Sequence, residues 1–320
     1  MKHNIKITAI LLLMFIATQF IGLYVVNYYS PVRISHGNIV NVSAPDLPFG
    51  LQSPELKENS DFNYAFFSIL LAFIIAISLM LFLTKLNAEF FLRLWFFLVI
   101  VISLGIVFNI LASNMGLFNH SIKLFSSIFP LSWIIAMIIS IPLAYVKIYK
   151  RYFLVHNITE LLVYPGIATI FVPILNIYTI SFLLIIISIY DAWAVWHSGI
   201  MQKMAKYQIN KLNVFSGFFI PYVSKKVKLQ MQKIKKSKIG NKKMKFNVAI
   251  LGGGDVVFPI ITAGVMLKTF GLMPAIFAIG GATLGLAYLF FFAEKKKFYP
   301  AMPFITAGIF AGMILSYLLL

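Results

Sequence analysis

Two aspartates of this 320-residue chain lie in long apolar runs, where little water is available to solvate a charge. Asp191 follows the run L-L-I-I-I-S-I-Y, and Asp255 follows three glycines in A-I-L-G-G-G-D-V-V-F. A charged side chain at the centre of a bilayer costs at least about 2.5–3.5 kcal/mol, so such residues usually face a cavity and mark a functional site. These two acids are therefore the first candidates for chemistry.

Two carboxyl groups a few ångströms apart cannot easily both ionise, so such a pair shares one proton. The ionised member can take a proton from water while the protonated member hydrogen-bonds the carbonyl of a peptide bond. Such a pair can carry out peptide hydrolysis, and the reaction then requires no metal and no covalent intermediate. The chain contains no cysteine, which excludes a thiol nucleophile and a cysteine zinc site. Which aspartate carries the proton is left open.

The elements that must position these acids are membrane-spanning helices. The chain is 61% hydrophobic and 11% charged, whereas soluble domains are roughly 45–50% apolar and about 25% charged. A spanning helix needs about 20 mainly apolar residues. The sequence therefore predicts an all-α polytopic membrane protein with nine transmembrane helices, at residues 7–28, 62–83, 90–111, 125–146, 154–173, 175–196, 246–267, 274–292 and 299–319.

Charge predicts the orientation of these spans. The formal net charge is +18, and the segment 197–245 holds thirteen lysines and no acidic residue. Because lysines and arginines favour the cytoplasmic side, we expect the N-terminus to be cytoplasmic and the C-terminus extracytoplasmic. The lysines lie between apolar runs, which indicates membrane topology and no nucleic-acid binding.

The expected organisation is one membrane domain over residues 1–320. Spans one to six occupy 1–196, a basic cytoplasmic loop occupies 197–245, and spans seven to nine occupy 246–320. Within the loop, residues 214–222 are too short to cross a bilayer and are expected at the membrane interface.

The two aspartates are expected at similar depths. Asp191 lies twelve residues before Lys203, and Asp255 lies ten residues after Lys245. At 1.5 Å per helical residue these separations are roughly 18 and 15 Å. Two antiparallel helices, consecutive in the sequence, then carry their acids near the cytoplasmic side. If the helices pack together, the carboxyl groups meet.

A third acid, Glu160, is a rival at about 14 Å from Arg151 by the same helical rise. His156 and Asn157 precede it by four and three residues, so all three share one helix face. Such a local polar cluster is more simply explained as a structural contact. A contribution of Glu160 and His156 to the chemistry is left open.

Three short motifs resemble those of the presenilin and signal peptide peptidase family of intramembrane aspartyl proteases. The first is Tyr190-Asp191, and the second is the Gly-x-Gly-Asp sequence that ends at Asp255. The third motif of that family is Pro-Ala-Leu at the start of the ninth span, where this chain has Pro300-Ala301-Met302. Leucine and methionine have similar volumes, so the substitution is tolerated in most cores.

The resemblance implies a presenilin-like fold and a hydrolase that cleaves transmembrane helices of other proteins. It implies that Asp191 and Asp255 are catalytic and that no cofactor takes part. Accessory subunits are left open. The basic loop matches the orientation of presenilins. The short chain is similar to prokaryotic members of the family, archaeal ones in particular. This likeness implies that the protein lies in the cell membrane of a prokaryote. The residues implied to shape the substrate cleft are Tyr190, Gly252, Gly253, Gly254, Pro300, Ala301 and Met302.

A substrate helix hides its peptide bonds in its own hydrogen bonds, so it must unwind before water can attack. We hypothesise that a backbone edge near Gly252 or Pro300 pairs with the unwound segment. Three other functions remain open: a proton- or cation-coupled transporter or channel that uses the same acids, a prepilin-peptidase-like enzyme, and a scaffold in which the acids only tie helices together. Inverted repeats are typical of transporters, and no internal repeat is found in the sequence.

Overall fold

The structure is a computed structural model. Within the residues it describes, nine helices are long and apolar enough to cross a membrane, which confirms the predicted helical membrane fold. The described residues are 5–30, 32–35, 38–41, 45–51, 58–115, 121–124, 127–150, 152–199, 216–222, 247–293 and 299–319, with single residues at 56, 204, 207, 208, 211 and 214. Most of the predicted basic loop, including residues 223–246, lies outside them.

The nine long helices follow one another along the chain, and the longest interval between them separates α6 from α9. They are α1 (Ile5–Tyr29), α2 (Asn59–Lys85), α3 (Glu89–Asn114), α4 (Leu131–Tyr145), α5 (Phe153–Phe171), α6 (Ile177–Trp193), α9 (Gly253–Phe270), α10 (Leu272–Phe292) and α11 (Met302–Leu319). Helical turns of other pitch extend α4, α5 and α6 over Val146–Lys150, Val172–Ile174 and Ala194–Ser198, and another forms Pro48–Gly50.

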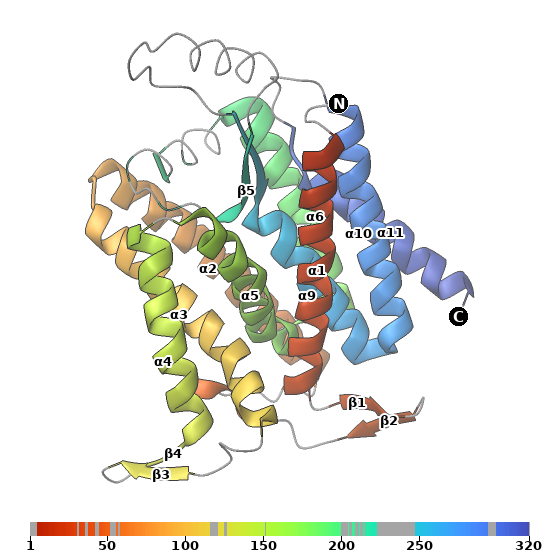
Figure 1. The fold of residues 1–320 in the computed structure, drawn as a ribbon. Coiled ribbons are helices and arrows are strands. Elements are labelled where there is room, and N and C mark those ends of the chain that lie inside the picture. Colours follow the sequence, from red (N-terminus) through yellow and green to blue (C-terminus); the bar gives the residue numbers. More distant parts are fainter. Residues whose placement is uncertain are drawn as a thin grey trace, which may run out of the picture.

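Three antiparallel hairpins complete the described structure. They are β1 (Val32–Ser35) with β2 (Asn38–Asn41), β3 (Ser121–Leu124) with β4 (Ser127–Pro130), and β5 (Gly217–Tyr222) with β6 (Asn247–Gly252). The first two hairpins lie at one end of the helix bundle, and β5 and the start of α1 lie at the other end (Figure 1). Helix α1 runs between these ends and contacts α5, α9 and α10.

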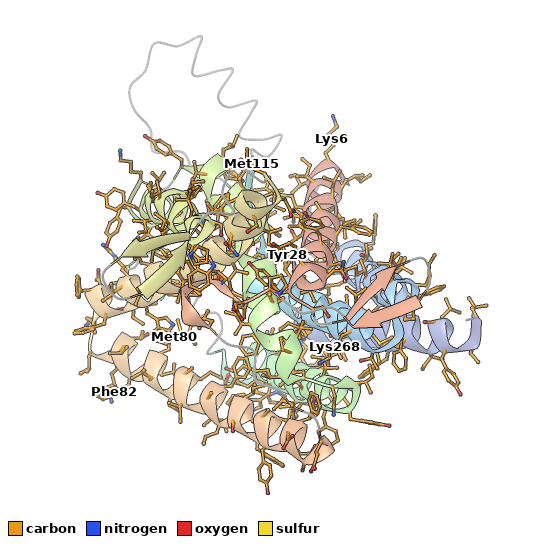
Figure 2. All side chains as sticks on the ribbon, turned by 90° about the horizontal axis from the view of Figure 1, so that it is seen from below. Lys6, Tyr28, Met80, Phe82, Met115 and Lys268 are labelled. Atoms are coloured by element: carbon orange, nitrogen blue, oxygen red, sulfur yellow. The ribbon has the colours of Figure 1, made fainter. Side chains whose placement is uncertain are left out.

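The main core is apolar and is formed in part by side chains of α1, α9 and the hairpin of β5 and β6. Leu11 and Phe15 of α1, Ile260 of α9 and Phe218 of β5 are completely buried in it. Large apolar side chains also cover the outside. Figure 2 shows Phe82 of α2 at the outer rim, and this side chain is 58% exposed. Such a surface is stable only against lipid, as expected of a multi-pass membrane protein.

Two sequence predictions of helix limits were wrong. The fourth span was expected from residue 125, but β4 ends at Pro130 and α4 begins only at Leu131. The seventh span was expected from residue 246, but residues 247–252 form β6, and α9 begins at Gly253. The strand pairs with β5, which occupies most of the stretch expected at the membrane interface. Because strands advance about 3.3 Å per residue, a depth for Asp255 counted at helical rise does not hold.

The predicted turn between the fifth and sixth spans is confirmed, and two devices stabilise it. Asn176 caps α6, because its Oδ1 accepts the Thr179 N–H at 2.9 Å while the Thr179 hydroxyl accepts the Asn176 N–H. The Lys268 ammonium of α9 donates to the carbonyl oxygens that follow α5, including that of Leu175 at 3.3 Å. A cation at a helix C-terminus is favourable because carbonyls there lack partners.

Helices α10 and α11 approach each other through glycines. A Cβ on Gly308 would overlap the carbonyl of Gly281, and a Cβ on Gly281 would overlap the carbonyl of Gly308. Small residues permit such backbone contact in membranes, where tight packing drives helix association. This contact sets the position of α11, whose first residue is Met302.

Gly308→Ala is therefore expected to lower stability by about 2 kcal/mol, because the added methyl group must push the two backbones apart. Gly280→Ala is the matched control, since a Cβ at that exposed neighbour in α10 meets no atom within 4 Å. Thermal unfolding in the same detergent compares the two. Equal melting temperatures would show that the close contact is not needed.

Candidate active site

Asp191 lies near the end of α6, and the start of α11 holds its carboxylate. The side chain is buried at 6% exposure. Its Oδ2 accepts the backbone N–H of Met302 at 3.0 Å, and the N–H of Ala301 also points to the carboxylate. The first N–H groups of a helix have no partner within the helix, so they are free to bind an anion. The Pro-Ala-Met motif thus supplies backbone donors to Asp191.

A second contact joins the same two helices. The Ser188 hydroxyl donates to the Thr306 hydroxyl at 2.8 Å, from residues one turn away from Asp191 and Met302 respectively. Both pairs lie in largely buried surroundings, where a well-formed hydrogen bond keeps its geometry. The two contacts together fix the rotation of α6 against α11, and therefore the direction of the Asp191 carboxylate.

Thr306→Val keeps the side-chain shape but removes the hydroxyl, so we expect a stability loss of about 1 kcal/mol. Cleavage of a helical peptide is expected to slow by roughly threefold to tenfold, because a small error in the position of a reacting group lowers the rate. Thr283→Val is the control, since that hydroxyl bonds only within α10, to Ile279. If both variants cleave at the wild-type rate, the contact has no role in positioning.

Asp255 lies in the first turn of α9, directly after β6. Its carboxyl turns back to the backbone N–H of Gly252, an arrangement that satisfies an otherwise free donor at a helix start. The next peptide unit is held from another helix, because the Gln19 amide of α1 donates to the Val256 carbonyl at 3.1 Å.

The two acids come together because α6 contacts α9. The structure places Asp191 and Asp255 near enough to interact electrostatically. The Asp191 carboxyl accepts the N–H groups of Ala301 and Met302, and the Asp255 carboxyl accepts that of Gly252. Two carboxyls held by different sets of backbone donors suit a division into proton donor and proton acceptor.

The other residues expected at the cleft differ in their positions. Tyr190 is 38% exposed, interacts electrostatically with Asp191 and lies with its ring beside Trp193. Gly253 is buried, and a Cβ there would come within 3.0 Å of the Tyr164 hydroxyl. Gly254 is exposed, and a Cβ there would meet only Phe258, at 3.8 Å. Of the three glycines, only Gly254 is both exposed and free of close neighbours.

The polar cluster on α5 has partners that the sequence did not reveal. Glu160 Oε1 lies 2.9 Å from Lys147 Nζ, and both side chains are almost completely buried. His156 and Asn157 bond to the backbone of β5. Among the described residues, no group of three His, Cys, Asp or Glu side chains is placed to bind a metal ion.

Sequence reasoning missed Gln19 and Tyr164 as residues that position the site. The usable signal for Gln19 was a lone amide in the middle of an apolar span, because such a group needs a partner in the membrane. Nothing in the sequence around Tyr164 distinguishes it from the other aromatic residues of the spans.

Comparisons with known proteins identify the family and the fold. The family model described as signal-peptide peptidase, presenilin aspartyl protease, matches residues 38–320. Two solved structures of a presenilin family intramembrane aspartate protease, in space groups C222 and P2, have TM-scores of 0.59 and 0.58, each at 16% identity. The first alignment covers 98% of this chain and 99% of that chain, and the second covers 97% of both. A comparison with curated proteins gave no match.

Proposed function

The chain belongs to the signal-peptide peptidase and presenilin family of aspartyl proteases, and from this premise we propose that Asp191 and Asp255 are its catalytic pair. The substrates we propose are transmembrane helices of other membrane proteins, cleaved within the bilayer. The observation that supports the proposal is the contact of α6 with α9, across which the two acids interact electrostatically, with Asp191 held by the Ala301 and Met302 N–H groups.

The reaction follows from one shared proton. The ionised carboxylate removes a proton from a water molecule, and the water oxygen attacks the peptide carbonyl carbon. The protonated carboxyl donates its hydrogen bond to the carbonyl oxygen as negative charge develops there. When the tetrahedral intermediate collapses, the C–N bond breaks, the nitrogen leaves with a proton from the pair, and a new carboxyl and a new amine remain.

Strand β6 offers a place where an unwound substrate can bind. Gly217 and Phe219 of β5 use their backbone groups away from β6. In an antiparallel ladder the residues facing them, Gly252 and Ile250, also direct their backbone groups outward. Among the described residues the sheet has two strands, so an extended substrate segment can add to β6 beside Asp255. This strand addition develops the hypothesis of an edge near Gly252.

We also propose the orientation predicted from charge, with the N-terminus in the cytoplasm of a prokaryotic cell. Substrates would then have their N-terminus outside. The start of α1 and the β5–β6 hairpin lie at the same end of the bundle (Figure 1), so both lie on the side that this proposal assigns to the cytoplasm. The residues that we propose shape the substrate cleft are Tyr190, Gly252, Gly253, Gly254, Pro300, Ala301 and Met302.

The test is cleavage by the purified full chain in detergent or vesicles. A single-span helical peptide should give two complementary fragments by mass spectrometry, with no metal added. If the chain cleaves no peptide of several tested but conducts protons or cations across vesicles, the transporter alternative replaces the protease. If neither activity is found in folded protein, the scaffold alternative stands.

A further inference from the structure

Three polar side chains of α5 bind the edge of β5 that faces away from β6. The Asn157 amide forms two bonds with Phe219, donating to its carbonyl at 3.0 Å and accepting its N–H at 3.1 Å. His156 Nε2 lies 2.9 Å from the Gly217 carbonyl, and Glu160 Oε1 accepts the Gly217 N–H at 3.4 Å. These side chains take the positions that a third strand would otherwise occupy.

The same face of α5 is also in contact with Lys147, and it extends to the start of α9. Lys147 neutralises Glu160 in a region where neither group meets water, so neither charge is left uncompensated. One turn beyond Glu160, the Tyr164 ring packs edge-on against Phe218 at 5.6 Å, and its hydroxyl lies against Gly253. Helix α5 thus contacts both β5 and the residue two before Asp255.

The hairpin needs this support because two strands alone are marginally stable. Its strands are separated by 24 residues in the sequence, and a connection of this length sets the register less strictly than a two-residue turn does. Strand β6 passes directly into Gly253, whose N–H donates to the Ser216 carbonyl at 3.3 Å. A displacement of β5 would therefore be transmitted through β6 to Asp255.

We infer that Asn157, with His156 and Glu160, is a positioning device for the reaction. It fixes the register of β5 and β6, holds Asp255 towards Asp191, and closes the β5 edge so that a substrate strand can add only to β6. The inference rests on the proposed proteolytic function, and it assigns α5 a role in selecting which peptide bond is cut. None of these three side chains is proposed to touch the substrate.

The test uses Asn157→Leu, which keeps the side-chain size and removes both bonds to Phe219. Asn109→Leu is the matched control, because that buried amide bonds to Tyr29 between α3 and α1, away from the hairpin. With one single-span peptide, Asn157→Leu should lower kcat by about tenfold to a hundredfold and spread the cuts over several peptide bonds. Asn109→Leu should lower the melting temperature but keep the wild-type kcat and cleavage position.

A purely structural role for Asn157 predicts a different result. Asn157→Leu would then melt earlier, as Asn109→Leu does, yet cut at the wild-type position with the wild-type kcat per folded molecule, and the inference would be overturned. If Asn157→Leu does not fold, Asn157→Asp replaces it. That variant still accepts the Phe219 N–H and loses only the donor, so a single wild-type cleavage position in Asn157→Asp would equally overturn the inference.

Hydrogen–deuterium exchange separates this inference from the proposed function. Amides of residues 247–255 should exchange faster in Asn157→Leu than in Asn109→Leu, whether or not any peptide is cleaved. Equal exchange in the two variants would show that α5 does not hold the hairpin. Absence of cleavage by the wild-type chain, together with faster exchange in Asn157→Leu, would reject the protease and retain the anchoring.

Discussion

Asp255→Asn is expected to abolish peptide hydrolysis while the protein stays folded. Asparagine has nearly the same shape as aspartate but cannot exchange the proton that the mechanism moves. Positioned acid–base catalysis contributes factors of about a hundred to ten thousand, so cleavage should fall by at least roughly a thousandfold when one member of the pair is lost. Single-turnover cleavage of a helical peptide, quantified by mass spectrometry, measures this loss.

Asp191→Asn should give the same loss, because the two carboxyls act as one unit. Its amide oxygen still accepts the Met302 N–H that the native carboxylate receives, so the start of α11 keeps a partner. Asp46→Asn is the control, since Asp46 is exposed and lies far from the pair along the chain. Cleavage that persists in either Asp191→Asn or Asp255→Asn would eliminate the paired mechanism.

Stability gives an independent reading of the same variants. Two acidic groups held near each other in lipid oppose ionisation, so the native pair is a source of strain. Asp255→Asn should therefore melt at the wild-type temperature or above it, although it is inactive. The wild-type rate should also fall at both low and high pH, because the reaction needs one protonated and one ionised carboxyl.

The sequence predicted the helices well because a bilayer permits few alternatives. A run of about twenty apolar residues must form a helix in lipid to satisfy its own backbone. The predicted spans 154–173 and 175–196 placed the turn between α5 and α6 correctly. The motifs Tyr190-Asp191 and Gly-x-Gly-Asp, which ends at Asp255, predicted the family that the comparison shows, while the catalytic role of the two acids stays a prediction.

The hairpin beside the site could not be predicted in the same way. A short apolar run such as V-A-I-L has no period that separates strand from helix, and the sequence reading extended the seventh span through it. The partner strand, β5, is separated from β6 in the sequence by the basic segment. It also contains Pro221, and proline is uncommon in a paired strand. The polar residues of α5 were correctly grouped, but their partner, the β5 backbone, is not visible from their spacing.

Gly254→Leu is expected to block substrate binding without disturbing the fold. Gly254 stands directly before Asp255, is exposed, and has no atom within 3.4 Å of the place its Cβ would take. A leucine side chain there is accommodated by the protein itself, and leucine favours a helix over glycine by up to about 1 kcal/mol. It would nevertheless occupy the space through which we propose the substrate backbone approaches β6 and the acids.

Gly280→Leu provides the matched control, because Gly280 is also an exposed helical glycine with open space around it, on α10. Gly254→Leu should lower kcat/KM for a single-span peptide by about a hundredfold, as expected when a substrate is held roughly 1 Å from its productive position. Gly280→Leu should keep the wild-type value, and both variants should melt at or above the wild-type temperature. If Gly254→Leu cleaves as fast as Gly280→Leu, the substrate does not pass over the start of α9, and strand addition at β6 is wrong even if the two aspartates are catalytic.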